Sequence, residues 1–339
     1  MPIVIDRNIP AYSVLQGERI FVMDKERATS QDIRPIEIAI LNLMPTKKET
    51  ETQFMRLLSN SPLQVNITLI HTESYRSKNT EAEYLERFYQ PFERVKERHF
   101  DGMIVTGAPV EDMEFKDVAY WDELTKLFDF TRTNVTSTIF ICWGAMAALN
   151  YFYGIPKYPL PRKLFGVFTH RKELTADPDP LMRGISDEFH VCHSRHSTVR
   201  ESDLKKEPRL KVLAASHRAG AAIVSNLDHS EVFVLGHMEY DRDTLEKEYE
   251  RDLKKGLPIE KPFNYFNDAG GIKMNWSSTA NLFYNNWLNF VYQTTPYHFD
   301  WAKYRELYQE ASRSAARGYA AGGAFFSRAA PRHASLFPF

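Results

Sequence analysis

Cys142 is the residue whose surroundings most favour covalent chemistry. In the segment ICWGAMAALNYF an apolar run ends at Cys142 and a helical pattern begins within two residues, which predicts a tight strand-to-helix turn that exposes a nucleophile. The helix N-terminus would favour thiolate over thiol, and the backbone N–H of Trp143 could donate to an oxyanion at an attacked carbonyl. A lone cysteine in an apolar segment is more often an inert core residue, so the assignment needs a base.

A base for this thiol is present in the segment EVFVLGHMEYD, which reads as a strand ending in His237 and Glu239. A spacing of two on a strand places both side chains on one face, so the carboxylate can orient the imidazole. A solvated strand end would also explain this pair. Together with the turn at Cys142, however, the pair completes a nucleophile, a base and a group that holds the base, which predicts acyl transfer through an acyl-cysteine.

The elements that must position these residues alternate regularly in the first half of the chain. Apolar, β-rich runs lie at 37–44, 64–72, 101–109 and 137–143, and amphipathic stretches lie at 48–60, 81–99, 121–132 and 144–154. This alternation predicts an α/β fold with a doubly wound, mostly parallel sheet and helices on both faces.

The second half of the chain has a different pattern of predicted elements. Short strands joined by turns are predicted in 163–174, 187–199, 211–218, 220–226 and 231–240, and we expect them to add antiparallel pieces to the sheet. Two helices are predicted, over 241–256 and 276–293, the second mostly buried. Beyond roughly residue 318 the periodicity is lost. We therefore expect a single domain over 1–300 and a C-terminal extension over 301–339 that is partly helical and then disordered.

The bulk composition favours small-molecule chemistry. With 43 lysines and arginines against 44 aspartates and glutamates, the net charge of −1 provides no field that would attract nucleic acid or an anionic membrane. Two cysteines in 339 residues indicate no disulfide framework and fit a cytoplasmic location. The charges of Asp6 and Arg7 interrupt any secretory signal, and no apolar run reaches membrane-spanning length.

One stretch, HVCHSRH, superficially resembles a metal site. Alternation along a strand sends His190, Cys192 and His196 to one face and His193 to the other. A closed tetrahedral shell would then need a bulge or a distant ligand, so we expect no bound metal.

The chain resembles the MetA-type homoserine O-acyltransferases, which fall within the class I glutamine amidotransferase-like group of flavodoxin-like folds. The resemblance covers roughly residues 1–297 and rests on MPIVIDRNIPA, LNLMPTKKETETQFMRLLSNSPLQV, VTGAPVE, CWGAMAALNYFYGI, HSR, GHMEYD and NWLNFVYQTTPY. It implies transfer of an acyl group from an acyl-CoA co-substrate to the hydroxyl of L-homoserine, in methionine biosynthesis, without a further cofactor. It also makes a homodimer plausible.

The resemblance assigns substrate-binding positions to Lys163, Ser194 and Arg251. A guanidinium can fork onto the carboxylate of homoserine, although Arg251 alone would read as the helical partner of a neighbouring acid. Lys47 matches a lysine near the acyl site and would otherwise be solvated at a helix start. The loop 106–109 follows a predicted strand and could supply a second oxyanion donor.

Within this family the residue after GAPV tracks the acyl donor, glycine resembling succinyl-CoA users and glutamate resembling acetyl-CoA users. Here it is Glu111. A carboxylate beside the acyl pocket repels the terminal carboxylate of a succinyl group and fills its space, which predicts a homoserine O-acetyltransferase. A homoserine O-succinyltransferase is the alternative, and Glu111→Gly is expected to shift preference toward succinyl-CoA.

Two other classes stay open. A glutamine amidotransferase-type hydrolase would use the same cysteine, histidine and glutamate, although Phe140 stands where such enzymes usually carry a glycine. A protein that keeps the fold but only binds ligands is the second. Nothing in the residues alone separates homoserine from other hydroxylated amino acids, since Arg251 would bind any α-carboxylate.

Overall fold

The computed structural model describes residues 3–18, 22–23, 34–74, 80–173 and 179–295, so the predicted extension over 301–339 lies outside the described residues. Its centre is one sheet with the strand order β2-β1-β4-β3-β6-β7-β12-β11-β10-β8-β9, and β5 pairs with β4. The neighbours from β2 to β12 are all parallel. These strands are β1 (Ile3–Val4), β2 (Val22–Met23), β3 (Ile36–Leu41), β4 (Val65–His71), β5 (Tyr89–Pro91), β6 (Phe100–Val105), β7 (Val135–Ile141) and β12 (Glu231–Val234).

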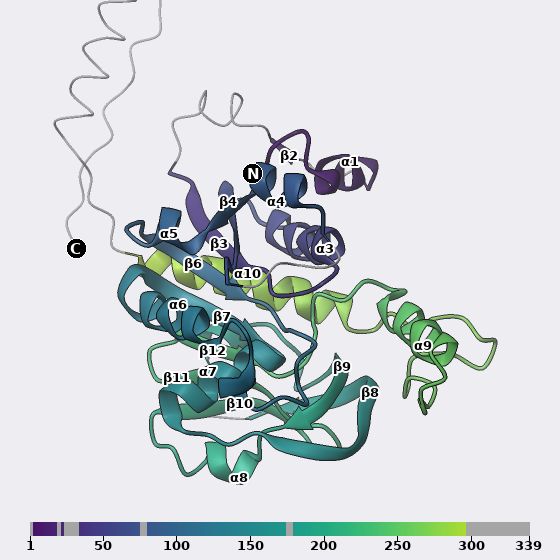
Figure 1. The fold of residues 1–339 in the computed structure, drawn as a ribbon. Coiled ribbons are helices and arrows are strands. Elements are labelled where there is room, and N and C mark those ends of the chain that lie inside the picture. The colour runs from purple at the N-terminus through teal and green to yellow at the C-terminus, as the bar shows by residue number, and fades with distance from the viewer. Residues whose placement is uncertain (1–2, 19–21, 24–33, 75–79, 174–178, 296–339) are drawn as a thin grey trace, which may run out of the picture. The chain divides into compact units, whose positions relative to one another are not determined.

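The rest of the sheet is antiparallel, as the short strands joined by turns in the second half of the sequence predict. The strands are β8 (Tyr158–Lys172), β9 (Glu188–Thr198), β10 (Leu210–Ser216) and β11 (Gly220–Asn226). β8 and β9 form a long hairpin whose pairing runs from Tyr158 opposite Thr198 to Arg171 opposite Glu188. Figure 1 shows this hairpin at the opposite end of the sheet from β1 and β2.

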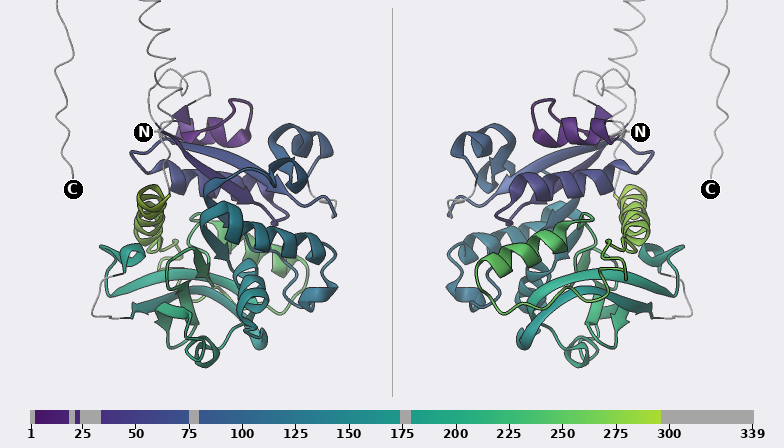
Figure 2. Two further views of the ribbon diagram at one scale, coloured as in Figure 1. Left: turned by 90° about the vertical axis from the view of Figure 1, so that its left-hand side faces the viewer. Right: turned by 90° about the vertical axis from the view of Figure 1, so that its right-hand side faces the viewer.

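Helices cover both faces of the parallel strands, which confirms the doubly wound α/β fold. Ile38 and Ile40 point into one hydrophobic core with α1 (Pro10–Gly17), α3 (Lys47–Ser59) and α10 (Ser277–Thr294). Ala39 and Leu41 point into the other, with α6 (Trp121–Asn134) and α7 (Trp143–Tyr153). Figure 2 shows α10, in yellow-green, on the other side of the sheet from the teal α6 and α7.

Two predicted helices differ in the structure. The single helix expected over 81–99 is wrong, because the segment divides into α4 (Ala82–Phe88), β5 and α5 (Phe92–Val95). Pro91 has no N–H and disfavours the helical conformation of the residue before it, so Tyr89–Pro91 pairs with β4 instead. The helix expected over 276–293 is present as α10, but it is not mostly buried, because its buried side chains form one stripe, namely Ala280, Phe283, Tyr284, Trp287, Leu288 and Val291.

The remaining elements are short or lie outside the sheet layers. They are η1 (Phe115–Asp117), η2 (Pro180–Met182), α8 (Glu201–Leu204) and α9 (Thr244–Lys254). Figure 1 shows α9 projecting beyond the strand ends on the side of β8 and β9. Within the described ranges, none of the helices combines the length and apolarity needed to cross a membrane.

Candidate active site

The strand-to-helix turn predicted at Cys142 is present between β7 and α7. Cys142 has φ 51° and ψ −114°, a left-handed conformation that costs a non-glycine residue about 1–3 kcal/mol. Its N–H donates to the carbonyl of Val234 at 2.7 Å, and its carbonyl accepts from Met146 N–H at 3.1 Å. The neighbouring strand and the first turn of α7 therefore hold the strained residue in place.

Gly144 lets α7 approach the loop after β6. A Cβ added at Gly144 would stand 2.6 Å from the backbone oxygen of Thr106, closer than real Cβ contacts. We expect Gly144→Ala to lower the free energy of unfolding by about 1–3 kcal/mol, measured by urea denaturation. Gly17→Ala is the control, because a Cβ there would meet nothing within 4 Å. Equal unfolding midpoints for the two variants would contradict this account.

The predicted partnership of His237 and Glu239 is present, but the predicted strand beneath them is wrong. β12 ends at Val234, and His237 instead forms an isolated bridge with Cys192 of β9, where its N–H donates to the Cys192 carbonyl at 2.7 Å. Gly236 permits this approach, since a Cβ there would stand 2.8 Å from that same carbonyl oxygen. Nδ1 of His237 lies 2.6 Å from Oε1 of Glu239.

Burial strengthens the electrostatic interaction between His237 and Glu239. His237 is 4% exposed and Glu239 is 7% exposed. Burial alone would lower the pKa of His237, but the Glu239 carboxylate and a hydrogen bond with Cys142 outweigh it and hold the pKa well above its usual value. The ring of Tyr240 stacks on the imidazole with centroids 4.2 Å apart. The site therefore favours the imidazolium form of His237.

The loop after β6 and the start of α7 both lie next to Cys142. Trp143 is the first residue of α7, where the helix itself offers its N–H no acceptor. Gly107 lies opposite, because a Cβ added there would stand 3.3 Å from Cβ of Cys142 and 3.6 Å from Cε1 of His237. The arrangement suits Trp143 as an oxyanion donor and gives the loop 106–109 direct access to the reacting atoms.

The cysteine and histidine open into a cavity of about 940 Å³ along the carboxyl ends of the parallel strands. This is the size of a site for a small organic ligand. The cavity brings together the other predicted substrate residues, namely Lys47, Glu111, Lys163, Ser194 and Arg251. Glu239 and Trp143 do not line it, and Glu239 contacts the lining residue His237 through Nδ1.

Lys163 and Ser194 meet two acids of α9 that sequence reasoning did not identify. Lys163 Nζ lies 3.1 Å from Asp252 Oδ2 and 3.4 Å from Glu248 Oε2, and Ser194 Oγ donates to that oxygen at 2.5 Å. Arg251 Nε donates to Asp252 Oδ1 at 2.7 Å. A spacing of four along a helix was the available signal, but in a strongly charged segment it does not stand out.

Lys47 is not the solvated helix residue that its sequence context suggests. It is 7% exposed, and its ammonium donates to the carbonyl of Asn42 at 2.5 Å. Burial lowers the pKa of Lys47 to about 8, although the fully buried Glu51 partly opposes the shift. Glu51 in turn accepts hydrogen bonds from the hydroxyls of Tyr84 and Tyr89.

The segment HVCHSRH forms most of β9. His193 is fully buried, with Nε2 3.2 Å from Nε2 of His170 on β8, and burial lowers the pKa of both imidazoles. Nε2 of His190 lies 3.4 Å from Oγ1 of Thr169 on β8. In the part of the chain that the structure describes, no group of three or more His, Cys, Asp or Glu side chains is placed to hold a metal ion.

Comparison with known proteins agrees with this geometry. A family model described as homoserine O-succinyltransferase matches residues 2–297. A protein named homoserine O-acetyltransferase from Methanomethylophilus alvi is 55% identical over 301 residues, covering 88% of this chain and 97% of the relative. One of the same name from Clostridium acetobutylicum is 55% identical over 301 residues, covering 88% of this chain and 99% of the relative.

Solved structures bear on the fold alone. A glutamine amidotransferase from Thermotoga maritima matches with a TM-score of 0.50 at 12% identity, covering 76% of this chain and 99% of that chain. This confirms the predicted glutamine amidotransferase-like architecture. The family match and the relatives at 55% identity confirm the resemblance read from the sequence, and the chain belongs to the homoserine O-succinyltransferase family.

Proposed function

We propose that this protein transfers an acetyl group from acetyl-CoA to the hydroxyl of L-homoserine through an acyl-Cys142 intermediate, a step of methionine biosynthesis. The observation that carries the proposal is the strained Cys142 beside the His237–Glu239 pair at the cavity. The names of relatives at 51–55% identity support homoserine as the acceptor and acetyl as the transferred group. The reaction needs no cofactor beyond its co-substrate.

The first half of the reaction loads the enzyme. The thiolate of Cys142 attacks the thioester carbonyl, and the tetrahedral oxyanion accepts a hydrogen bond from the N–H of Trp143. Collapse breaks the bond between carbon and the CoA sulfur, which takes the proton of His237 and leaves as a thiol. Because one thioester replaces another, the acetyl-enzyme is close in free energy to the donor and remains reactive.

The second half transfers the acetyl group to the acceptor. His237, now neutral, removes the hydroxyl proton of homoserine as its oxygen attacks acetyl-Cys142. Collapse releases the O-acetyl ester and restores the thiolate and the imidazolium. The Glu239 carboxylate, 2.6 Å from Nδ1, orients the ring so that Nε2 serves both half-reactions.

The ends of the cavity suit the two substrates. Arg251 offers a guanidinium to the acceptor carboxylate, and Lys163 and Ser194 lie beside Glu248 at the same end. The carboxylate of Glu111 lines the cavity and opposes a second negative charge, which favours acetyl over succinyl. A cytoplasmic location and a homodimer remain predictions from the sequence.

A donor-by-acceptor matrix on the purified protein tests this function. We expect release of free CoA to be fastest with acetyl-CoA and L-homoserine, and to fall at least tenfold when water or L-serine replaces homoserine. Faster release with succinyl-CoA would favour the succinyltransferase. A rate of CoA release that does not depend on the acceptor, or ammonia release from glutamine at a comparable rate, would favour a hydrolase.

A further inference from the structure

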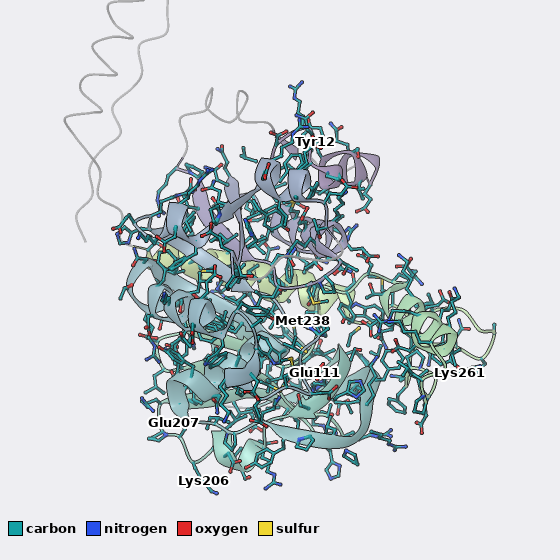
Figure 3. All side chains as sticks on the ribbon, viewed as in Figure 1. Tyr12, Glu111, Lys206, Glu207, Met238 and Lys261 are labelled. Carbon is teal, nitrogen blue, oxygen red and sulfur yellow. The ribbon has the colours of Figure 1, made fainter. Side chains whose placement is uncertain are left out.

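The side chain of Glu111 is held by the edge strand of the sheet. Its Oε2 accepts the backbone N–H of His196 at 2.6 Å, the backbone N–H of Ser197 at 3.1 Å and the Ser197 hydroxyl at 3.3 Å. Glu111, labelled in Figure 3, lies beside β9. Three donors that converge on one carboxylate oxygen are what an anion-binding site provides.

The backbone on which Glu111 stands is fixed separately. Lys157 Nζ donates to the carbonyl of Glu111 at 2.5 Å and to the carbonyl of Met113 at 2.6 Å. The loop therefore does not depend on the Glu111 side chain for its place. Removing that side chain should leave the loop where it is and the two N–H groups on β9 without an acceptor, while the Ser197 hydroxyl keeps only the weak acceptor Sδ of Met146, at 3.6 Å.

A buried positive charge lies behind the same donors. Arg195 is 1% exposed, and its hydrogen bonds run to the carbonyl of Ser197 at 2.7 Å, the carbonyl of Ala219 at 2.6 Å and Nδ1 of His193 at 3.3 Å. In the described part of the chain it forms no ion pair with a carboxylate. Its charge therefore adds to the attraction of the three donors for an anion.

We propose that the backbone N–H groups of His196 and Ser197 and the Ser197 hydroxyl form a carboxylate subsite for the acyl donor, which Glu111 occupies from within the chain. The inference rests on the proposed function and extends it to donors whose acyl chain ends in a carboxylate, as succinyl does. A tethered carboxylate competes at a high effective concentration, so free donor carboxylates are excluded while Glu111 is present.

On this account Ser197 is a second specificity-determining residue, hidden until residue 111 is changed. Glu111→Gly vacates the carboxylate subsite, and the donor carboxylate then accepts the same three hydrogen bonds. A hydrogen bond to a charged group is worth roughly a tenfold change in affinity or more. Ser197→Ala should therefore cancel much of the gain that Glu111→Gly gives.

Calorimetric titration of the full chain with succinyl-CoA, butyryl-CoA and acetyl-CoA tests the inference. A Cys142→Ala background prevents acyl transfer during the measurement. We expect Glu111→Gly to raise affinity for succinyl-CoA over the uncharged butyryl-CoA roughly tenfold, and added Ser197→Ala to remove most of that gain. Thr198→Ala is the matched control, because its hydroxyl donates to the Val199 carbonyl and its side chain alternates to the other face.

Two results would overturn the carboxylate subsite. Equal gains for succinyl-CoA and butyryl-CoA would mean that Glu111 acts by bulk alone, and equal effects of Ser197→Ala and Thr198→Ala would place the donor carboxylate elsewhere. Unchanged binding of acetyl-CoA shows that the site of each variant is intact. If Ser197→Ala abolishes acetyl-CoA binding, Ser197→Thr, which keeps the hydroxyl, is compared with Ser197→Val, which lacks it. Because the titration needs no transfer, its outcome is separate from failure of acetyl transfer in the unaltered protein.

Discussion

Replacing Cys142 with alanine is expected to lower kcat/KM for acetyl transfer to L-homoserine by roughly 10⁴-fold or more. Alanine has no atom that can accept the acetyl group, so the proposed route through acetyl-Cys142 is lost. The oxyanion donor and the cavity would leave only a small residual rate. Steady-state assay of CoA release, with homoserine varied, measures the loss.

The acetyl-enzyme itself provides a second measurement. Mass spectrometry after incubation with acetyl-CoA alone should find the adduct on Cys142 and none on Cys192, which is fully buried and whose pKa burial raises well above its ordinary value. Cys192→Ala is the matched control and should keep the adduct. An adduct on Lys47 in place of Cys142, or transfer that survives in Cys142→Ala, would remove the proposed mechanism.

The alternating part of the fold was predictable because its signals are local. β3, β6 and β7 are buried on both faces and each ends in a short apolar run, and the helices between them keep a regular amphipathic period. The break at Pro91 was visible in the sequence. Its pairing with β4 was not, since that depends on a partner strand distant along the chain.

The placement of the proposed catalytic residues was predictable, although the structure changes the reason in one respect. Cys142 depends on its own turn, which the sequence indicates. His237 is placed by Gly236 and Cys192, whose backbones approach each other from β9 and the segment after β12. Side-chain spacing on a strand gave the right pair for the wrong reason, because β12 ends three residues before His237.

The burial of polar groups was beyond sequence reasoning. Lys47 reads as a solvated first-turn lysine, yet Asn42 from the end of β3 and Glu51 from α3 enclose it together with Tyr89. Asn42 and Glu51 are close to Lys47 along the chain, but Tyr89 comes from the distant β5, so no local pattern reports that the group is buried. The acids Glu248 and Asp252 were missed for the same reason, since their partners lie on β8 and β9.

Glu239→Gln is expected to lower kcat/KM for acetyl transfer by roughly 10³-fold while leaving the shape of the site unchanged. The amide can still reach Nδ1 of His237, but it carries no charge. Oε2 of Glu239 is buried and has no hydrogen-bond partner among the described residues, so the interaction that is lost is mainly that of the full carboxylate with the imidazolium. Burial, no longer opposed by that charge, then lowers the pKa of His237.

The direction of the pH effect follows from that shift. In the unaltered protein the pKa of His237 lies well above its unfolded value of about 6.5. The imidazolium is therefore fully present below pH 6.5, roughly, and is lost as pH rises through the pKa of the folded protein. In the proposed mechanism the departing CoA sulfur takes the proton of this imidazolium. Glu239→Gln lowers the folded pKa, so the alkaline limb of the kcat/KM profile should move to lower pH.

Glu231→Gln separates this effect from the general cost of losing a buried acid. Glu231 is 4% exposed and is held by Arg132 and Tyr153 at the start of β12, away from the cavity. Its replacement should lower stability without moving the alkaline limb. If Glu239→Gln reduces the rate at every pH by the same factor, or if both variants shift the limb alike, Glu239 does not act through the charge of His237, and its role reduces to holding the ring in place.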